Sequence, residues 1–270
     1  MLMLVRCFVC FFAAFIFFGT MSIASPIGDT TGVTPLSSKK MKLIWADDFN
    51  IPGKPDSTKW AYDIGNGPNG WGNWELQFYT DRTDNAVVEN GVLKVKAKRE
   101  PLGGYAYTSA RMVTRGKFEF TYGSVEIRAK LPAEIGTWPA VWMLGKNISS
   151  IGWPACGEID ILEHRGKERD KIITALHYTA RHGENPDKSE TIIPNSTKEF
   201  HIYRLDWTKE SINLYIDNKQ VHAFKNEHSL PYNADFYLLV NMAMGGGFGG
   251  PVDPDFKEST FEIDYIRVYK

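Results

Sequence analysis

Residues 157–164 read GEIDILEH, with three carboxylates set among branched aliphatic residues. Aliphatic residues of this kind favour a buried strand. Alternate side chains of a strand share a face, so Glu158 and Asp160 point the same way, but plain alternation turns Glu163 away. One extra residue accommodated as a β-bulge at 161–162 reverses this and brings Glu163 beside the other two. The stretch therefore predicts a buried, bulged strand with three carboxylates on one face.

The spacing of the two glutamates indicates the chemistry. An unbulged strand holds the Cα atoms of Glu158 and Glu163 about 16 Å apart, at ~3.3 Å per residue. The bulge shortens this to ~13 Å, and each side chain can lean roughly 4 Å toward the other. The remaining gap of about 5 Å is that of retaining glycosidases, whereas inverting enzymes need ~6.5–9.5 Å. Carboxylates this close repel, so at least one pKa is expected to rise, as a general acid requires.

The stretch GEIDILEH, together with WPAC directly before it, resembles the active-site strand of glycoside hydrolase family 16. The spacing E-x-D-x-x-E is similar to that of the laminarinase branch and differs from the E-x-D-x-E of lichenases and xyloglucan-acting enzymes. The resemblance runs from about Leu43 to Lys270. It implies that Glu158 is the nucleophile, that Glu163 is the acid/base, and that Asp160 between them tunes both.

Composition excludes several classes of partner. The chain has 270 residues, a formal net charge of −1 and no basic run, so nucleic acid and anionic membranes are not expected as partners. Hydrophobic residues make up 43% of the chain, which is ample for a core. Eight Trp and twelve Tyr exceed what packing asks for, and stacking on sugar rings would explain the excess. A polysaccharide is the expected partner, and a monomer the expected state.

The N-terminus is typical of an export signal. Arg6 precedes an apolar stretch over 8–18, and small residues follow at 22–24, so cleavage is expected after Ala24. The apolar run is short for a membrane span. The expected organisation is a signal peptide (1–24), a flexible linker rich in Gly, Pro, Ser and Thr (25–42), and a catalytic domain (43–270) that is secreted or periplasmic. Only Cys156 remains after cleavage, so no internal disulfide is expected.

Short alternating segments separated by turn residues predict an all-β fold. Lys alternates with apolar residues over 92–98, which indicates a half-exposed strand. Residues 116–130 predict two strands hinged near Gly123. Asp217 and Asn218 predict a hairpin turn. Further strands are expected over 200–207, 211–216, 220–224 and 261–269. Antiparallel strands without a βαβ rhythm indicate a β-sandwich of two antiparallel sheets. The family resemblance implies a jelly roll whose concave sheet forms the substrate cleft.

Two tryptophans and a histidine are expected near the carboxylates. Trp138 and Trp142 lie an even number of residues apart, hence on one strand face, and the pattern W-P-A-x-W-x-L matches the family's. Trp138, beside Gly and Pro, is expected to be a sugar platform, whereas Trp142 is equally compatible with a core position. The family's counterpart of His177 reaches the carboxylates, so we expect His177 to bond Asp160 or the leaving sugar.

Other cleft residues follow from the resemblance. The segment NGWGNWELQFYT (69–80) is similar to the family's G-W-G-N-N-E-L-x-Y-Y-T, with Trp71 matched and Trp74 in place of Asn. Asn66 lies close by and could bind hydroxyls. Arg111 in YTSAR and Asn241 in the segment 236–250 are expected to hydrogen-bond sugar. In that last segment Phe248 replaces the family's Trp.

The mechanism needs no metal, and no residue spacing indicates a catalytic one. The resemblance implies a possible structural Ca²⁺, with the Asp264 side chain and backbone oxygens near Asp48 and Gly91 as ligands. An ordinary Asp on the last strand is an equally good interpretation of Asp264.

The sequence thus predicts a secreted retaining endo-β-glucanase that acts on β-1,3-glucans such as laminarin. Two alternatives remain open. The first is a family 16 hydrolase acting on mixed-linkage glucan or an algal galactan. The second is a carbohydrate-binding sandwich without catalysis, which the presence of all three carboxylates argues against.

Overall fold

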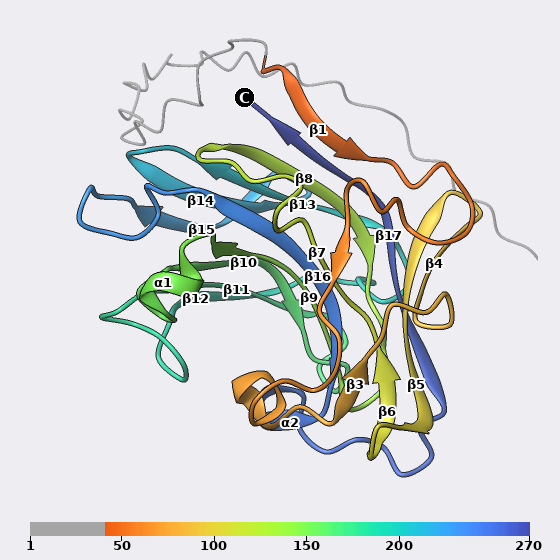
Figure 1. Ribbon diagram of the computed structural model, residues 1–270. Coiled ribbons are helices and arrows are strands. Elements are labelled where there is room, and N and C mark those ends of the chain that lie inside the picture. Colours follow the sequence, from red (N-terminus) through yellow and green to blue (C-terminus); the bar gives the residue numbers. More distant parts are fainter. Residues whose placement is uncertain (1–40) are drawn as a thin grey trace, which may run out of the picture. The chain divides into compact units, whose positions relative to one another are not determined.

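Two β-sheets packed face to face account for most of the structure (Figure 1). The computed structural model describes residues 41–270, so the expected signal peptide and nearly all of the expected linker lie outside the described residues. Within that range no helix has the length and apolar character needed to cross a membrane. The expected all-β sandwich of jelly-roll type is confirmed.

The larger sheet has ten strands in the described residues. Its central path runs β15-β14-β13-β8-β17-β5-β6-β3, with β1 beside β17 and β4 beside β5. Its pairs are antiparallel except β3 with β6, which run parallel. The strands are β1 (Leu43–Asp47), β3 (Gln77–Tyr79), β4 (Ala86–Glu89), β5 (Val92–Leu102), β6 (Tyr105–Ser109), β8 (Gly123–Lys130), β13 (His201–Trp207), β14 (Ser211–Ile216), β15 (Lys219–Lys225) and β17 (Glu258–Tyr269).

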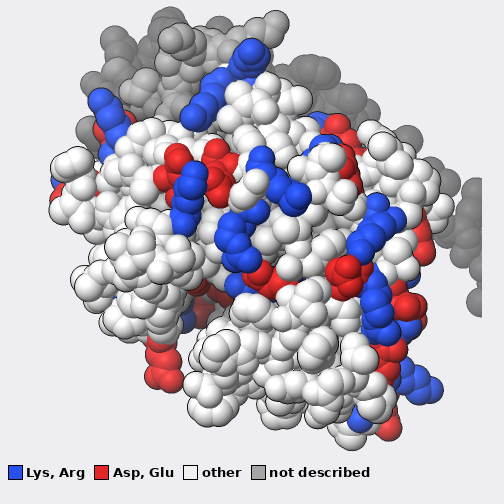
Figure 2. Space-filling model, viewed as in Figure 1, with Lys and Arg blue, Asp and Glu red and all other residues white. Residues whose placement is uncertain are grey.

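The smaller sheet carries the predicted catalytic strand near its centre. Its order is β12-β11-β10-β9-β16-β7-β2. The strands are β2 (Ala61–Tyr62), β7 (Arg111–Val113), β9 (Thr137–Gly145), β10 (Glu158–His164), β11 (Lys171–His177), β12 (Asp187–Ile192) and β16 (Phe236–Met244). Three short helical segments flank this sheet, namely η1 (Gly70–Trp74), α1 (Ile148–Ile151) and α2 (Gly246–Gly249). Figure 2 shows the surface hollowed between the part that carries α1 and the part that carries η1 and α2.

The core lies between the two sheets and is built by alternation. In β5 the residues Leu93, Val95 and Ala97 are fully buried, while the intervening Lys side chains reach outward, as predicted. In β16 all nine residues are buried, because this strand lies in the middle of its sheet. Each large aliphatic side chain buried in this way contributes about 1.5–3 kcal/mol relative to exposure. The core therefore holds the sandwich together without a disulfide, and Cys156 is a free, buried thiol.

The prediction of a strand over 116–122 is wrong. That segment begins with a turn, in which the amides of Lys117 and Phe118 both donate to the Thr114 carbonyl, and only Phe120 makes an isolated bridge. Its aromatic residues stack instead, with Phe118 against both Trp45 and Phe120. The alternating apolar residues that suggested a strand are Phe118 and Phe120, whose rings cover the core without strand pairing. The second predicted strand, β8, begins at Gly123 as expected.

The predicted bulge in β10 is confirmed. Against β9, Asp160 pairs with Trp142 and Leu162 pairs with Val141, so β10 holds one extra residue between these pairs. A matching shift between Asp160 and Glu163 occurs against β11. Leu162 is fully buried in the core. The bulge therefore turns Glu163 to the side of the strand that carries Asp160.

Candidate active site

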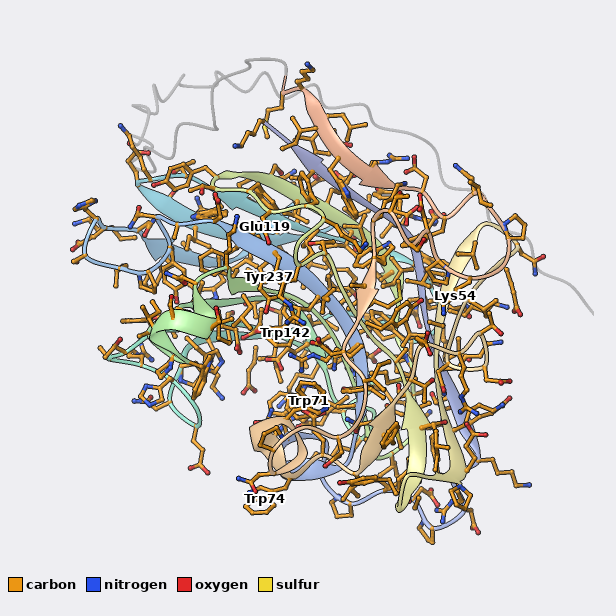
Figure 3. The ribbon with its side chains drawn as sticks, viewed as in Figure 1. Lys54, Trp71, Trp74, Glu119, Trp142 and Tyr237 are labelled. Atoms are coloured by element: carbon orange, nitrogen blue, oxygen red, sulfur yellow. The ribbon has the colours of Figure 1, made fainter. Side chains whose placement is uncertain are left out.

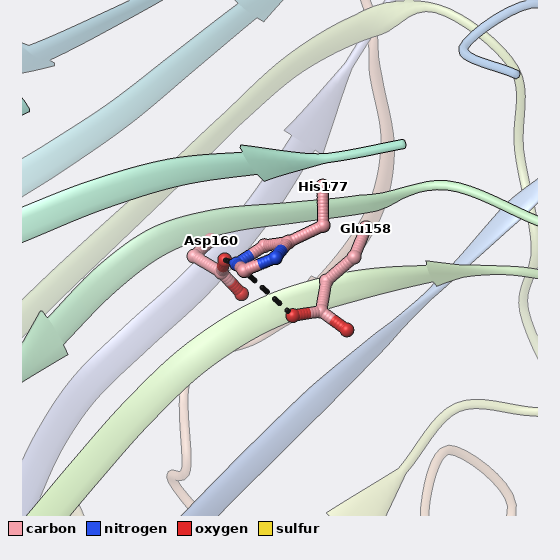
Figure 4. A group of neighbouring side chains, drawn as sticks. All are labelled: Glu158, Asp160 and His177. Atoms are coloured by element: carbon pink, nitrogen blue, oxygen red, sulfur yellow. Dashed lines mark ion pairs between the residues drawn. The ribbon is translucent and has the colours of Figure 1, made fainter. Parts of the chain in front are cut away.

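Three carboxylates and one imidazole form the centre of the site, and Figure 4 shows two of the carboxylates, Glu158 and Asp160, with the imidazole of His177. Glu158, Asp160 and His177 each offer an atom within 4.8 Å of the others. Asp160 is 3% exposed and Glu163 is 9% exposed, whereas the Glu158 side chain keeps 17% of its surface. The strand thus holds its acidic groups in a largely dehydrated place that remains open to a substrate at Glu158.

Burial raises the pKa of all three carboxyl groups well above that of a solvated one. For Glu158 and Glu163 the neighbouring charge of Asp160 raises the pKa further, and the pKa of all three groups is about 8. Carboxyl groups this close titrate as a unit. Loss of the first proton leaves a negative charge in the cluster, and this charge raises the pKa of the groups that are still protonated. A cluster of this kind keeps a proton available near neutral pH, as general acid catalysis requires.

His177 lies where the sequence predicts it. It ends β11 and pairs with Glu158 across the sheet. Its Nε2 is 3.2 Å from Oδ2 of Asp160 and 3.7 Å from Oε1 of Glu158. The Tyr232 hydroxyl donates to the His177 carbonyl oxygen at 3.0 Å, which fixes the end of the strand. The imidazole therefore faces both carboxylates from one nitrogen.

Each glutamate accepts a hydrogen bond from an indole. Trp138 Nε1 donates to Glu163 Oε1 at 3.0 Å, and Trp153 Nε1 donates to Glu158 Oε2 at 3.0 Å. A donor on a carboxylate favours its ionised form, so each bond lowers the pKa that burial raises. The sequence analysis missed Trp153, although it opens the WPAC motif five residues before Glu158. Its ring also lies 5.8 Å from the ring of His177.

Trp142 and Asn241 belong to a hydrogen-bonded chain beside the carboxylates. Trp142 Nε1 donates to Asn241 Oδ1 at 2.7 Å, and Asn241 Nδ2 donates to the Tyr79 hydroxyl at 3.0 Å. The Tyr79 hydroxyl donates to Glu75 Oε2 at 3.1 Å. Burial raises the pKa of the Glu75 carboxyl group at the end of the chain. Asn241 thus has one protein partner on its amide oxygen and one on its amide nitrogen, and it fixes the Trp142 ring.

Arg111 is held between two of the predicted tryptophans. Its guanidinium lies 4.4 Å from the Trp71 ring centre and 4.9 Å from that of Trp142. Its Nε donates to Asp63 Oδ2 at 3.1 Å, and only 8% of the residue is exposed. In Figure 3 Trp142 and Trp71 lie in a row, with Trp74 farther out. Trp74, which stands where the family pattern has Asn, is 70% exposed, so its indole lies in solvent.

Asn66 has a supporting part in this segment. Its amide donates to the carbonyl oxygens of Glu75 and Gln77, at 2.9 and 2.8 Å. Both amide hydrogens are therefore committed to backbone. They hold the segment that carries Trp71 in a conformation with positive φ at consecutive residues 69–72. Two of these four residues are Gly, which adopts positive φ readily.

Phe248 lies beside Trp138 of β9. It belongs to α2, and its ring centre is 4.9 Å from that of Trp138. The Arg165 guanidinium covers the same ring at 4.8 Å. Trp138 is thus braced by Phe248 on one side and bonded to Glu163 at its nitrogen. The structure brings Phe248 to Trp138 and not to Trp71 or Arg111.

The suggested calcium ligands are engaged by other groups. The Asp264 carboxylate accepts from Arg128 Nη1 at 2.5 Å, and the Asp48 carboxylate accepts from Arg267 Nε at 2.8 Å. Gly91 lies in the turn between β4 and β5, with φ of +74°. The expected calcium ligands near Asp48 and Gly91 are backbone oxygens rather than the Asp48 carboxylate, and the Arg128 bond engages one of the two Asp264 oxygens. The calcium site remains a prediction.

Comparison with known proteins identifies the family. Residues 74–267 match the model of glycosyl hydrolases family 16. The chain is 42% identical over 245 residues to a protein named beta-glucanase from Rhodothermus marinus, over 85% of each chain. The structure resembles the laminarinase from Flavobacterium sp. UMI-01, with a TM-score of 0.79 and 47% identity over 85% of this chain and 100% of that one. It also resembles the catalytic domain of an endo-1,3-beta-glucanase (laminarinase) from Thermotoga petrophila RKU-1, with a TM-score of 0.80 and 38% identity over 85% and 98%. The chain with the bulged GEIDILEH strand is therefore a glycoside hydrolase of family 16.

Proposed function

We propose that this chain is an exported, retaining endo-β-1,3-glucanase that cleaves laminarin-type glucans. Glu158 is the nucleophile and Glu163 is the acid/base in this proposal. The observation that carries it is the bulge in β10, which puts the buried Glu163 and the partly buried Glu158 on one side of a strand with an indole donor on each. The relatives named for β-glucanase and laminarinase activity support the choice of substrate.

In the first step a Glu158 carboxylate oxygen attacks the anomeric carbon. The bond from that carbon to the leaving oxygen breaks as Glu163 gives its proton to this oxygen. The product is a glycosyl ester of Glu158 and a free chain end. The pKa values of Glu158 and Glu163 are both raised to about 8, so the cluster holds a proton before the step, and this proposal assigns it to Glu163. Trp153 keeps Glu158 oriented and favours its charged form.

In the second step water attacks the same carbon from the opposite face. Glu163, now ionised, takes a proton from that water, and the ester bond to Glu158 breaks. Two inversions leave the product in the β configuration. Esterification also removes the charge of Glu158 beside Asp160, which makes it easier for Asp160 to ionise. In this proposal Asp160 holds its proton while Glu158 is charged and releases it to water more readily while Glu158 is esterified.

Uncharged aromatic side chains suit a neutral glucan. Trp71, Trp138, Trp153 and Phe248 flank the carboxylates, and Arg111 is paired with Asp63. A sulfated galactan would need unpaired Lys or Arg close to the reacting groups. Mixed-linkage β-1,3-1,4-glucan is the second candidate substrate, because the same neutral surface would accept it. A purely binding function has no use for a general acid with a raised pKa.

Proton NMR of the earliest product tests the mechanism. We expect laminarin to release the β anomer first, with internal bonds cut before chain ends. Glu158→Ala and Glu163→Ala should each abolish polysaccharide hydrolysis. With an activated substrate and azide, the first variant should form an α-glycosyl azide and the second a β-glycosyl azide. Initial release of the α anomer would make the enzyme inverting.

A substrate panel and the mature N-terminus test the remaining parts. Laminarin, lichenan, agarose and carrageenan should be compared by release of reducing ends. Degradation of agarose or carrageenan with laminarin left intact would contradict the proposed substrate. N-terminal sequencing of the exported protein should begin after Ala24. Sedimentation should give the mass of one chain.

A further inference from the structure

The loop between β11 and β12, residues 178–186, contacts the groups that touch the carboxylates. The Gly183 amide donates to His177 Nδ1 at 3.2 Å. The His182 ring meets the Trp153 ring edge-on, with centres 5.4 Å apart. Tyr178 and Arg181 close the loop with two backbone hydrogen bonds of 2.9 Å. This loop thus reaches both His177 and Trp153 without contributing an acid or a base.

The Gly183 contact determines which His177 nitrogen carries the proton. A backbone amide can only donate, so Nδ1 must offer a lone pair to accept from it. A neutral imidazole has one N–H, which is then at Nε2. That nitrogen is the one facing Asp160 and Glu158 (Figure 4). An imidazolium would set an Nδ1 hydrogen against the Gly183 hydrogen.

The loop is tied across the sandwich by Asp187. One carboxylate oxygen of Asp187 accepts from Arg181 Nη1 at 2.6 Å, and the other lies 2.8 Å from His222 Nε2. His222 belongs to β15 of the opposite sheet and is 7% exposed. Its Nδ1 is 3.1 Å from the hydroxyl of Thr174, a buried residue of β11. Arg181 also donates to the Pro186 carbonyl at 2.8 Å. The Arg181 side chain therefore joins the first half of the loop to its end at Pro186 and Asp187.

We propose that residues 178–187 position the catalytic machinery: the Gly183 amide fixes His177 as the Nε2–H tautomer, and the Asp187–His222 contact sets where that amide lies. Asp187 and His222 are positioning residues, because they act only through the loop. The inference rests on the proposed function for its effect on rate. The tautomer itself follows from the geometry of His177 and Gly183 alone.

Long-range proton–nitrogen NMR of protein labelled with ¹⁵N-histidine tests the tautomer directly. The chain has six His, and the signal lost in His177→Gln assigns His177. We expect a neutral ring with hydrogen on Nε2 at the pH of maximal activity. Hydrogen on Nδ1, or on both nitrogens, would overturn the proposal whatever the substrate proves to be. Release of the α anomer, by contrast, would refute the mechanism and leave the tautomer untouched.

Asp187→Ala tests the anchor. We expect the His177 signals to shift toward a mixture of tautomers, and kcat on laminarin to fall about tenfold with KM changed less than twofold. Asp187→Asn keeps an acceptor for His222 and should recover part of both. Glu190→Ala, on the exposed face of the same strand, is the control and should match wild type.

A second variant distinguishes a folding defect from displacement of the Gly183 amide. Arg181→Gln breaks the contact with Asp187 at a side chain that is 41% exposed, so the fold should survive. We expect its melting temperature to stay near wild type while kcat falls in the same direction as in Asp187→Ala. Wild-type tautomer and kcat in a folded Arg181→Gln and Asp187→Ala would refute the role of the anchor.

Discussion

The indole nitrogen of Trp153 lies 3.0 Å from Oε2 of Glu158, although Trp153 is outside the catalytic strand and 44% exposed. Trp138 makes the same bond to Glu163 from the neighbouring strand β9. Both bonds favour ionised carboxylates at a place where burial disfavours them. The proposed nucleophile and the proposed acid are therefore each adjusted by one neutral donor, which can be removed without adding charge.

Trp153→Phe should move the acidic limb of the pH profile of kcat/KM upward. The variant keeps an aromatic ring beside His177 but loses the donor that lowers the pKa of Glu158. The nucleophile must be ionised, so activity falls as pH drops through this pKa, and a higher pKa starts that loss sooner. Hydrogen bonds to charged groups contribute about 1.5–3 kcal/mol, so we expect roughly a tenfold or greater loss at pH 5–6. Trp74→Phe, in solvent, is the control.

Trp138→Phe should move the alkaline limb upward instead. Its indole donor lowers the pKa of Glu163, so removing it raises that pKa above about 8. The acid must be protonated for the first step, so its activity is lost as pH rises through this pKa, and in the variant the loss should begin at higher pH. The pH profile of kcat/KM on laminarin measures it. An unmoved alkaline limb would mean that Glu163 is not the group controlling that side.

Asn241→Leu should destabilise the fold and weaken substrate binding together. It leaves Trp142 Nε1 without a partner and removes one donor from the Tyr79 hydroxyl, which keeps its bond to Glu75, at a site that is 5% exposed. Each unsatisfied buried group costs about 1–3 kcal/mol, and one kcal/mol shifts Tm by roughly 2–4 °C at this length. We expect a loss of ~2–12 °C by calorimetry, with KM raised. The exposed Asn50→Leu is the control, and an equal loss there would contradict the argument.

The sequence predicted those elements whose structure depends on the alternation of residues within a single strand or on the residues of a single turn. The bulge of β10 could be predicted because two adjacent residues conflict with plain alternation: Leu162 must face the core, and Glu163 must share the face of Glu158 and Asp160. Asp217 and Asn218 form the predicted hairpin turn with φ of 48° and 66°. The segment 116–122 failed because its alternation serves ring stacking, which depends on Trp45 far away in sequence.

The site was predictable where side chains lie on strands. Strand alternation fixes the direction of Trp138, Trp142 and His177, and each reaches the carboxylates or their neighbours as expected. Trp153 lies in a loop, where no periodicity gives a direction, so its bond to Glu158 appears only in three dimensions. Asn66 was predicted to bind sugar hydroxyls, whereas its amide hydrogens bond to the backbone. The sequence does not show whether an asparagine amide is exposed or buried.

Asp160→Asn should stabilise the protein at alkaline pH while reducing its activity. Burial raises the pKa of Asp160 in the folded state, whereas the unfolded chain has an ordinary pKa near 4. Between these values the folded state binds more protons than the unfolded one, so the free energy of unfolding falls as pH rises. That stability is fully present below the unfolded pKa and is lost as pH rises through the folded pKa.

Asparagine cannot ionise, so in the variant the free energy of unfolding should not fall with pH on account of residue 160. We expect Tm to be nearly unchanged at pH 4 and roughly 5 °C higher than wild type at pH 8, about 1–2.5 kcal/mol for a chain of this length. Differential scanning calorimetry across pH measures it, with the exposed Glu258→Gln as control. Activity should fall because asparagine can neither hold nor release the proton that Asp160 shares with the two glutamates. Equal pH dependence of Tm in Asp160→Asn and wild type would mean that the buried carboxyl group is not protonated in the folded enzyme.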